Sequence, residues 1–481
     1  MGTMSLARIF RAARVRRTVA AAAVVLSIGG LVLFRTPAMG SSYLPLLTDT
    51  NTPTMVHFKG PAAHGSIGIS QVKLLAGSER DLYAEVRLAA DKENGEAVRA
   101  PLALAVVLDT SGSMYTDGKI DQARRAVLDL IRDMRDEDQI AVIRYSDSAE
   151  VIQPLARLGE VRHALTSRIE HLEAEGGTSI PSGLSAGLRT LEEATRGRVR
   201  RVVLVSDGLD SSRASAEAIA RQSFGKGVTI SALGIGLDFD ESYMSSVAVA
   251  GHGHYGFVKD ASTLTTFLGK ELGEAAATTI EDATVRIHVP HGLHFVAASG
   301  ADARMLDEDE LELKLGALYA GDERRAVLHF TARLDVGDLA DLTSDASWVR
   351  VAGGSDTKVE VAPLSLYGTG DATLAEASRD GAVFASWTSV SSSERSMQAA
   401  QAYKDGDTGR AQVLLDQNIA AISAATAAAP PAVAADLQRQ QASYVETKRG
   451  FGAQPHSAAG QGAAKRAVEL DTANLGRSGG F

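Results

Sequence analysis

Five short oxygen-bearing side chains stand at three separate places in the sequence: Asp109, Ser111, Ser113, Thr178 and Asp207. The first three directly follow the apolar run LALAVVL, the fourth follows a pair of glycines, and the last follows the run RVVLV and a serine. Carboxylates and hydroxyls are hard ligands, which bind Mg²⁺, Mn²⁺ or Ca²⁺ in preference to zinc or copper. These residue types therefore predict a site for a hard divalent cation.

The small number of ligands favours Mg²⁺ among these cations, although Mn²⁺ or Ca²⁺ would accept the same oxygen atoms. Mg²⁺ takes about six ligands and keeps several waters, so short side chains with space between them suit it. Two carboxylates at most neutralise the ion. If one or both reach it through water, the ion stays able to attract a further carboxylate from outside.

The elements that must position these residues follow an alternating pattern. Continuous apolar runs are typical of strands buried on both faces of a parallel sheet, and apolar residues three and four apart are typical of helices. We expect strands at 102–108, 140–145, 201–205, 228–235 and 255–258, and helices at 119–134, 161–172, from 181, 214–224, 244–250 and 262–274. Such alternation predicts a doubly wound α/β fold with a mostly parallel sheet, over residues 101–275.

The cation site should lie at one edge of this sheet. In open α/β sheets, ligands bind beyond the carboxyl ends of the strands. Asp109 and Asp207 each follow a predicted strand, and Thr178 lies in a loop expected at the same edge.

These residues resemble a known site. The pattern Asp109-x-Ser111-x-Ser113, then Thr178, then Asp207-Gly208, is similar to the metal-ion-dependent adhesion site of von Willebrand factor type A domains. The resemblance implies that the two serines contact the ion directly and that the threonine binds it directly or through water. It also implies that the two aspartates act mainly through water, and that a protein partner supplies the missing ligand as an Asp or Glu.

The flanking segments predict further domains. Alternating strands at 66–100 and 276–368 favour an antiparallel β-sandwich into which the α/β domain is inserted. Residues 369–449 are Ala-rich and predict a helical region with a hairpin that turns near Lys404–Asp407. We expect a linker at 41–65 and a disordered tail at 450–481, where few large apolar residues remain.

The N-terminus has the features of an export signal. Residues 1–18 contain five arginines and no acidic residue, residues 19–34 are uncharged and apolar, and small residues follow at 38 and 40. This order predicts a signal peptide over 1–40, or a signal anchor in which residues 19–34 cross the cytoplasmic membrane. Either places the rest of the chain in the periplasm or at the cell surface.

Composition excludes several classes of protein. The chain has no cysteine, so disulfides, thiolate metal sites and thiol catalysis are excluded. Its formal net charge of -10 argues against nucleic acid as the main partner.

Other motifs have simpler explanations. Gly183–Gly187 matches the G-x-S-x-G pattern of hydrolases, but it lies in a predicted helix, so packing of small residues explains it better. Gly251–Gly256 matches G-x-G-x-x-G, but the expected strand follows it instead of preceding it, which favours a tight turn. The histidines at 288, 291 and 294 are expected in a strand–turn–strand, and His252 with His254 is a weak candidate metal pair.

We therefore expect a non-enzymatic binding protein with no catalytic residues, whose partner-binding residues beyond the cation site the sequence does not identify. The alternative is a metal-dependent hydrolase or phosphotransferase that uses the same ion as a Lewis acid. It would need a general base near the ion, and the sequence places no candidate at that edge. A chaperone-like subunit acting with an ATPase is a third possibility, against which the export signal argues.

Overall fold

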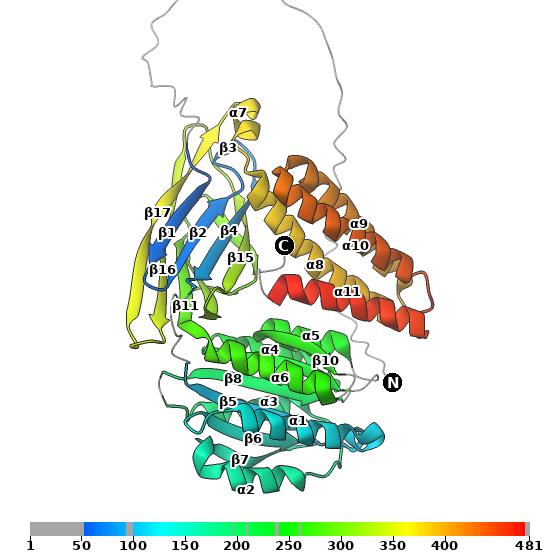
Figure 1. Ribbon diagram of the computed structural model, residues 1–481. Helices are drawn as coiled ribbons and strands as arrows, with labels where there is room; N and C mark the ends of the chain where they lie inside the picture. Colours follow the sequence, from blue (N-terminus) through cyan, green and yellow to red (C-terminus); the bar gives the residue numbers. More distant parts are fainter. Residues whose placement is uncertain are drawn as a thin grey trace, which may run out of the picture. The chain divides into compact units, whose positions relative to one another are not determined.

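The computed structural model describes residues 52–92, 100–195, 197–207, 210–235, 240–258 and 261–476. Within these residues lie an α/β domain, two further sheets and a group of C-terminal helices (Figure 1). The predicted export signal lies outside the described residues. No helix among the described residues is both long and apolar enough to cross a membrane.

The α/β domain is built on a six-stranded sheet in the order β10-β9-β8-β5-β6-β7. All pairings in this sheet are parallel except that of β6 with β7, which is antiparallel. The strands are β5 (Leu102–Asp109), β6 (Gln139–Tyr145), β7 (Ala149–Arg157), β8 (Val199–Ser206), β9 (Val228–Ile235) and β10 (His252–Val258). Every residue of β5 and β9 is buried, which explains the continuous apolar run 102–108 in β5.

Helices cover both faces of this sheet, as predicted for a doubly wound fold. One face packs against α1 (Lys119–Asp133), α2 (Leu158–Glu170) and α6 (Ala261–Ala276). The other face packs against α3 (Ile180–Leu191), α4 (Arg213–Phe224) and α5 (Glu241–Ala250). A short 3-10 helix, η1 (Gly112–Gly118), precedes α1.

Small residues bring α3 close to the sheet, which confirms the packing explanation of the G-x-S-x-G motif. A Cβ atom on Gly183 would lie 2.7 Å from the Tyr145 ring, and one on Gly187 would lie 2.7 Å from Val107. The G-x-G-x-x-G segment begins β10, and the 288–294 histidines span the turn from β11 to β12, both as expected.

The remaining strands form two sheets that share one hydrophobic core, as the predicted β-sandwich requires. Their orders are β1-β2-β4-β15-β12 and β13-β14-β11-β16-β17-β3, and every pairing is antiparallel except β3 with β17. The α/β domain is inserted in the sequence between β4 and β11. The strands are β1 (Met55–Gly60), β2 (Ala63–Ile69), β3 (Lys73–Leu75), β4 (Arg80–Ala90), β11 (Thr278–His288), β12 (Leu293–Ser299), β13 (Asp302–Met305), β14 (Glu310–Tyr319), β15 (Glu323–Ala332), β16 (Leu339–Arg350) and β17 (Asp356–Thr369).

Part of the predicted linker is wrong. Residues 55–60 form β1, which pairs antiparallel with β2, and the latter begins at Ala63. Val56 and Phe58 point into the sandwich core and are buried. Only two buried side chains anchor this strand, which is too short a pattern to stand out from the polar residues around it.

The C-terminal region contains the predicted helical hairpin and further helices before and after it. Its helices are α7 (Ala372–Ala377), α8 (Gly381–Lys404), α9 (Thr408–Ala428), α10 (Pro431–Gly450) and α11 (Ala458–Gly476). The α8–α9 turn lies where it was expected, because Asp407 caps α9 by accepting a hydrogen bond from the Arg410 amide.

The predicted disordered tail is wrong for residues 458–476, which form α11. Its buried residues are small: Ala463, Ala464, Ala467 and Val468 pack in the same core as Tyr403 and Phe451. Alanine buries little area per residue, so the pattern resembled a low-complexity tail. Its high helix propensity and the close approach that it allows stabilise a packed helix instead.

The helical region contacts the α/β domain at the start of α5. Glu241 is buried there and forms ion pairs with Lys404 of α8 (2.7 Å) and Lys465 of α11 (2.8 Å). Arg213, at the start of α4, donates to Gln401 of α8 at 3.2 Å. These contacts fix the helices against the α4 and α5 side of the domain.

Candidate functional site

The predicted cation ligands lie at the carboxyl edge of the parallel sheet. Asp109 is the last residue of β5, and Asp207 directly follows β8, its neighbour in the sheet. The parallel register pairs Leu108 with Val205, so Asp109 lies level with Ser206 and Asp207 follows one residue further along the chain. Ser111 and Ser113 follow Asp109 into η1.

Asp109 is fully buried and held by several donors. Its Oδ1 accepts from the Ser111 amide at 2.8 Å, and its Oδ2 accepts from the Ser206 hydroxyl at 2.6 Å and the Tyr145 hydroxyl at 3.4 Å. Burial raises the pKa of Asp109 above its ordinary value, the hydrogen bonds from Ser206 and Ser111 lower it in part, and the Asp207 charge adds to the rise. A cation near this carboxylate would favour its ionised form.

A chain of hydrogen bonds joins the two serines to Asp207. The Ser111 and Ser113 hydroxyl oxygens lie 3.0 Å apart, and the Ser113 hydroxyl donates to Asp207 Oδ1 at 2.8 Å. Ser111 and Asp207 are buried, whereas Ser113 is exposed. The oxygen atoms therefore extend from the interior of the domain to its surface.

Thr178 lies in the loop between α2 and α3, and backbone hydrogen bonds tie that loop to the Asp109 turn. The Gly112 amide donates to the Gly176 carbonyl at 3.0 Å, and the Glu175 amide donates to the Thr110 carbonyl at 2.7 Å. Thr178 itself is half-buried, two residues beyond the bonded Gly176. The structure thus brings the three predicted segments to one place.

Lys119 is a residue of this site that the sequence reasoning missed. Its ammonium Nζ donates to Asp207 Oδ2 at 2.5 Å, and the side chains of Lys119 and Asp207 are only 8% and 0% exposed. The sequence signal was present: Lys119 lies at the start of a helix whose next residue, Ile120, faces the core.

Tyr145 and Ser206 were also missed, although the strand-end rule could have found them. Each is the last residue of a parallel strand, and their hydroxyls meet on Asp109 Oδ2. Asp210 adds a further link, because it accepts hydrogen bonds from the Ile180 amide at 2.8 Å and the Ser212 amide at 2.7 Å. It therefore joins the segment after Asp207 to the start of α3.

The donor set fits a hard divalent cation. The oxygen atoms that converge at this edge belong to serine hydroxyls and to the buried carboxylates of Asp109 and Asp207, the second of which also contacts the Lys119 ammonium. Mg²⁺, Mn²⁺ and Ca²⁺ prefer such ligands. The exposed position of Ser113 leaves the outer side of the group open to solvent or to another molecule.

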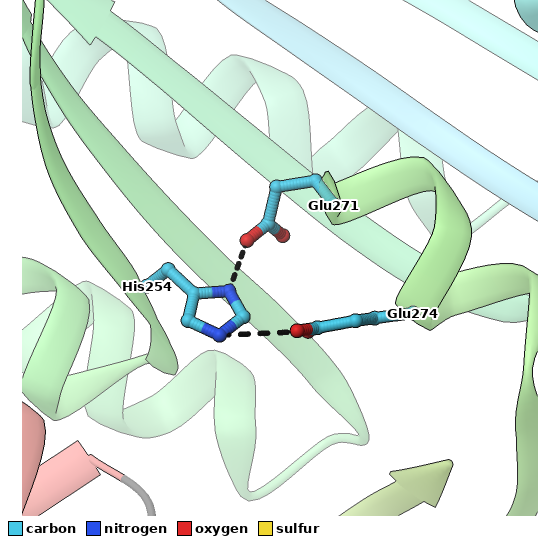
Figure 2. Close-up of side chains that lie close together, drawn as sticks. All are labelled: His254, Glu271 and Glu274. Atoms are coloured by element: carbon cyan, nitrogen blue, oxygen red, sulfur yellow. Dashed lines mark hydrogen bonds and ion pairs between the residues drawn. The ribbon is translucent and has the colours of Figure 1, made fainter. Parts of the chain in front are cut away.

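A second group of potential metal ligands lies near the amino ends of the same strands. It consists of His254 of β10 with Glu271 and Glu274 of α6, whose ligand atoms all lie within 4.8 Å of one another. Figure 2 shows the imidazole between the two carboxylates: Nδ1 contacts Glu271, and Nε2 lies 3.4 Å from Glu274. His252, the other member of the weak metal pair, instead stacks on Phe224 with ring centroids 3.6 Å apart.

The charges of this second group are balanced by protein groups. Arg201 donates to Glu271 Oε2 at 3.0 Å, and the Ser231 hydroxyl donates to the same oxygen at 2.7 Å. Burial alone would raise the pKa of Glu271, but the hydrogen bond from His254 and the charge of Arg201 outweigh it and lower the pKa to about 2. Arg201 lies 3.0 Å from Glu271 and Lys270 lies 3.9 Å from Glu274, so cationic side chains of the protein already offset both carboxylates. We therefore interpret this group as an ion-pair network that joins α6 to the sheet.

A mostly parallel sheet covered on both faces, with an oxygen cluster beyond its central strands, defines the class of open α/β domains that bind ligands at their carboxyl edge. Within that class the family is specific: residues 103–270 match the von Willebrand factor type A domain, and the chain contains a domain of this family.

Relatives with similar sequences match only part of this chain. YfbK of Escherichia coli (strain K12) is 26% identical over 216 residues, which are 44% of this chain and 37% of that protein. The protein sll0103 of Synechocystis is 30% identical over 207 residues, which are 41% of this chain and 47% of that protein. The alignments thus span less than half of the length of either relative.

The similarity of fold extends further than that of sequence. The solved structure of von Willebrand factor type A from Catenulispora acidiphila superposes with a TM-score of 0.64 at 19% identity. The match covers 89% of this chain and 98% of that one. The combination of α/β domain, β-sandwich and helices is therefore a shared architecture.

Proposed function

We propose that this protein is an exported, non-enzymatic binding protein whose von Willebrand factor type A domain holds Mg²⁺ and uses it to bind an acidic residue of a protein partner in the cell envelope. The domain family supports a role in protein interaction. The observation that supports the finer proposal is the hydrogen-bonded row Ser111–Ser113–Asp207, whose middle residue is exposed, together with the buried Asp109 that precedes it.

The residues that would hold the ion are Asp109, Ser111, Ser113, Thr178 and Asp207. When bound, the ion would supply a positive, electrophilic position at the surface of the domain. Ser206 and Tyr145 would keep the Asp109 carboxylate in a fixed orientation, because both donate to its Oδ2. Asp210 would keep the Thr178 loop close to Asp207 through its bond to the Ile180 amide.

Export is the part of the proposal that rests on sequence alone. The five arginines before the apolar segment 19–34 support a signal peptide or a single membrane anchor. An envelope location would place the domain where it can meet extracellular or periplasmic proteins. Separation of cell fractions, with and without carbonate extraction, would distinguish a free from an anchored protein.

Isothermal titration of purified full-length protein with Mg²⁺ tests the cation site. We expect saturable heat for the native protein and none for Asp109→Ala. Asp133→Ala removes an exposed aspartate of α1 and is the matched control, which should bind as the native protein does. Equal heats for the native and Asp109→Ala proteins would exclude this site.

Capture of partners from an envelope extract tests the adhesive role separately. A partner that binds in Mg²⁺ and is released by EDTA is expected, and Asp109→Ala should not capture it. Binding that survives chelation would contradict the proposal. Metal-dependent turnover of phosphoesters or peptides by the native protein, lost in Asp109→Ala, would instead favour the hydrolase or phosphotransferase.

A further inference from the structure

The position of Lys119 beside the cation site needs an explanation. A buried ammonium is costly unless it is paired. Lys119 is also the first residue of α1, and a positive charge at the N-terminus of a helix is disfavoured by the helix dipole. Neither burial nor helix position favours a lysine here, so its 2.5 Å contact with Asp207 Oδ2 must account for it.

Lys119 leaves part of Asp207 available to the site. The ammonium occupies Oδ2, whereas Oδ1 accepts from the Ser113 hydroxyl at 2.8 Å. The carboxylate is therefore oriented with one oxygen towards the lysine and the other towards the exposed residue Ser113. Lys119 acts on the proposed ion through Asp207 and through its charge, which makes it a positioning residue.

The charge of the site depends on this lysine. With both carboxyl groups ionised, Asp109 and Asp207 contribute two negative charges and Lys119 contributes one positive charge. A bound Mg²⁺ then leaves one net positive charge, which a single carboxylate neutralises. Without the lysine, the loaded site would carry no net charge, so its attraction for an added carboxylate would be weaker.

We propose that Lys119 adds a positive charge to the metal-loaded site and thereby strengthens its binding of a partner carboxylate. This inference rests on the proposed function and specifies its partner chemistry: a single Asp or Glu side chain reaching the ion. Lys119 is expected to weaken cation binding, since it competes for Asp207, and to strengthen carboxylate binding to the loaded site. The two effects have opposite signs, which a purely structural role would not produce.

Lys119→Gln is the appropriate variant, because a glutamine amide can still donate to Asp207 but has no charge. Mg²⁺ affinity is measured by isothermal titration, and carboxylate binding by fluorine NMR of fluoroacetate added to the Mg²⁺-saturated protein. We expect the variant to bind Mg²⁺ more tightly than the native protein does and fluoroacetate at least about tenfold more weakly, or about 1.4 kcal/mol.

Two further variants separate charge from other effects. Lys119→Arg keeps the charge and should retain fluoroacetate binding better than Lys119→Gln. Lys270→Gln removes an exposed lysine of α6 and should match the native protein in both measurements. Fluoroacetate binding by Lys119→Gln within about twofold of the native value would overturn the inference.

A second measurement guards against a variant that folds poorly. The melting temperature is recorded in EDTA and in Mg²⁺, because a ligand stabilises the state that binds it. We expect Mg²⁺ to raise the melting temperature of Lys119→Gln more than that of the native protein; an equal or smaller rise would contradict the inference. If the native protein binds no Mg²⁺, the proposed function fails; if it binds Mg²⁺ but no fluoroacetate, the function's cation part stands and this inference is wrong.

Discussion

The α/β domain has two clusters of charged side chains at opposite ends of its parallel sheet, and they differ in how their charges are balanced. At the carboxyl end, Lys119 pairs with Asp207, Asp109 lies buried nearby, and Ser113 in the middle of the oxygen row is exposed. At the amino end, Glu271 and Glu274 lie on either side of His254, and Arg201 and Lys270 each pair with one of the two glutamates.

The two clusters also differ in their access to solvent. Glu271 and His254 have side chains only 4% and 16% exposed, and their polar atoms contact one another. The cluster at the carboxyl end has two carboxylates and one ammonium, and its residue Ser113 is exposed. It can therefore accept a cation from outside. The comparison teaches that uncompensated negative charge at an accessible place indicates binding. A buried network whose charges compensate one another indicates a role in stability.

Removing one member of the ion-pair network around Glu271 should cause the largest change, which is a loss of unfolding free energy. Glu271→Ala would leave Arg201 and His254 near an empty space, and breaking a buried ion pair costs about 3–5 kcal/mol. Chemical denaturation should show this loss of unfolding free energy, while the Mg²⁺ affinity of the folded protein stays within about twofold of native. The exposed Glu170→Ala is the control, and a Mg²⁺ affinity lost in Glu271→Ala would break the distinction between the clusters.

Acid should weaken the same network. The pKa of Glu271 is lowered to about 2 in the folded protein, so the unfolded chain takes up its proton first as pH falls. The contribution is complete above the ordinary glutamate pKa and is lost as pH falls towards 2, by roughly 3 kcal/mol at about 1.4 kcal/mol per unit. Denaturant unfolding between pH 6 and pH 2.5 should therefore be steeper in pH for the native protein than for Glu271→Gln, and parallel curves would refute this assignment.

Asp207→Asn should weaken Mg²⁺ binding at the carboxyl end of the sheet and leave the Glu271 network intact. It removes a proposed ligand and the partner of Lys119, so Mg²⁺ affinity should fall at least about a hundredfold, or about 2.8 kcal/mol. The acid sensitivity due to Glu271 should be unchanged. Isothermal titration and the pH series together test both statements, and a native Mg²⁺ affinity in this variant would remove Asp207 from the site.

The general architecture and the predicted ligand segments could be found from sequence because both depend on local patterns. Buried strands are continuous apolar runs, and residues that directly follow parallel strands share one edge. Asp109 and Asp207 lie together for this reason. The metal itself remains a prediction, since the resemblance of five residue types suggested it.

The residues that escaped prediction depend on contacts distant in sequence. Lys119 is buried because Asp207, far along the chain, approaches it, and no periodicity reports such a pair. The same holds for Glu271, whose partners come from β8, β9 and β10. The helix α11 was missed for another reason, because small side chains form its packed face.

The smallest expected effect concerns an exposed aromatic residue beside the cation site. Tyr115 lies in η1, two residues after Ser113, and is 79% exposed. A surface substitution such as Tyr115→Ser should change unfolding free energy by no more than about 0.5 kcal/mol and leave Mg²⁺ affinity unchanged. Aromatic residues are enriched at protein interfaces, so capture of the envelope partner in Mg²⁺ should nevertheless weaken severalfold.

The matched control is Val413→Ser, because Val413 is an exposed apolar residue of α9 at 56% exposure, on an element distant in sequence from the site. It should leave both stability and capture unchanged. Equal capture by Tyr115→Ser and the native protein would mean that the partner touches the ion without covering η1. Weaker capture in Tyr115→Ser alone would mean that the partner contacts the segment between Ser113 and Lys119 as well as the cation. The partner-binding surface would then lie at the carboxyl end of the sheet, where the negative charge is not fully compensated.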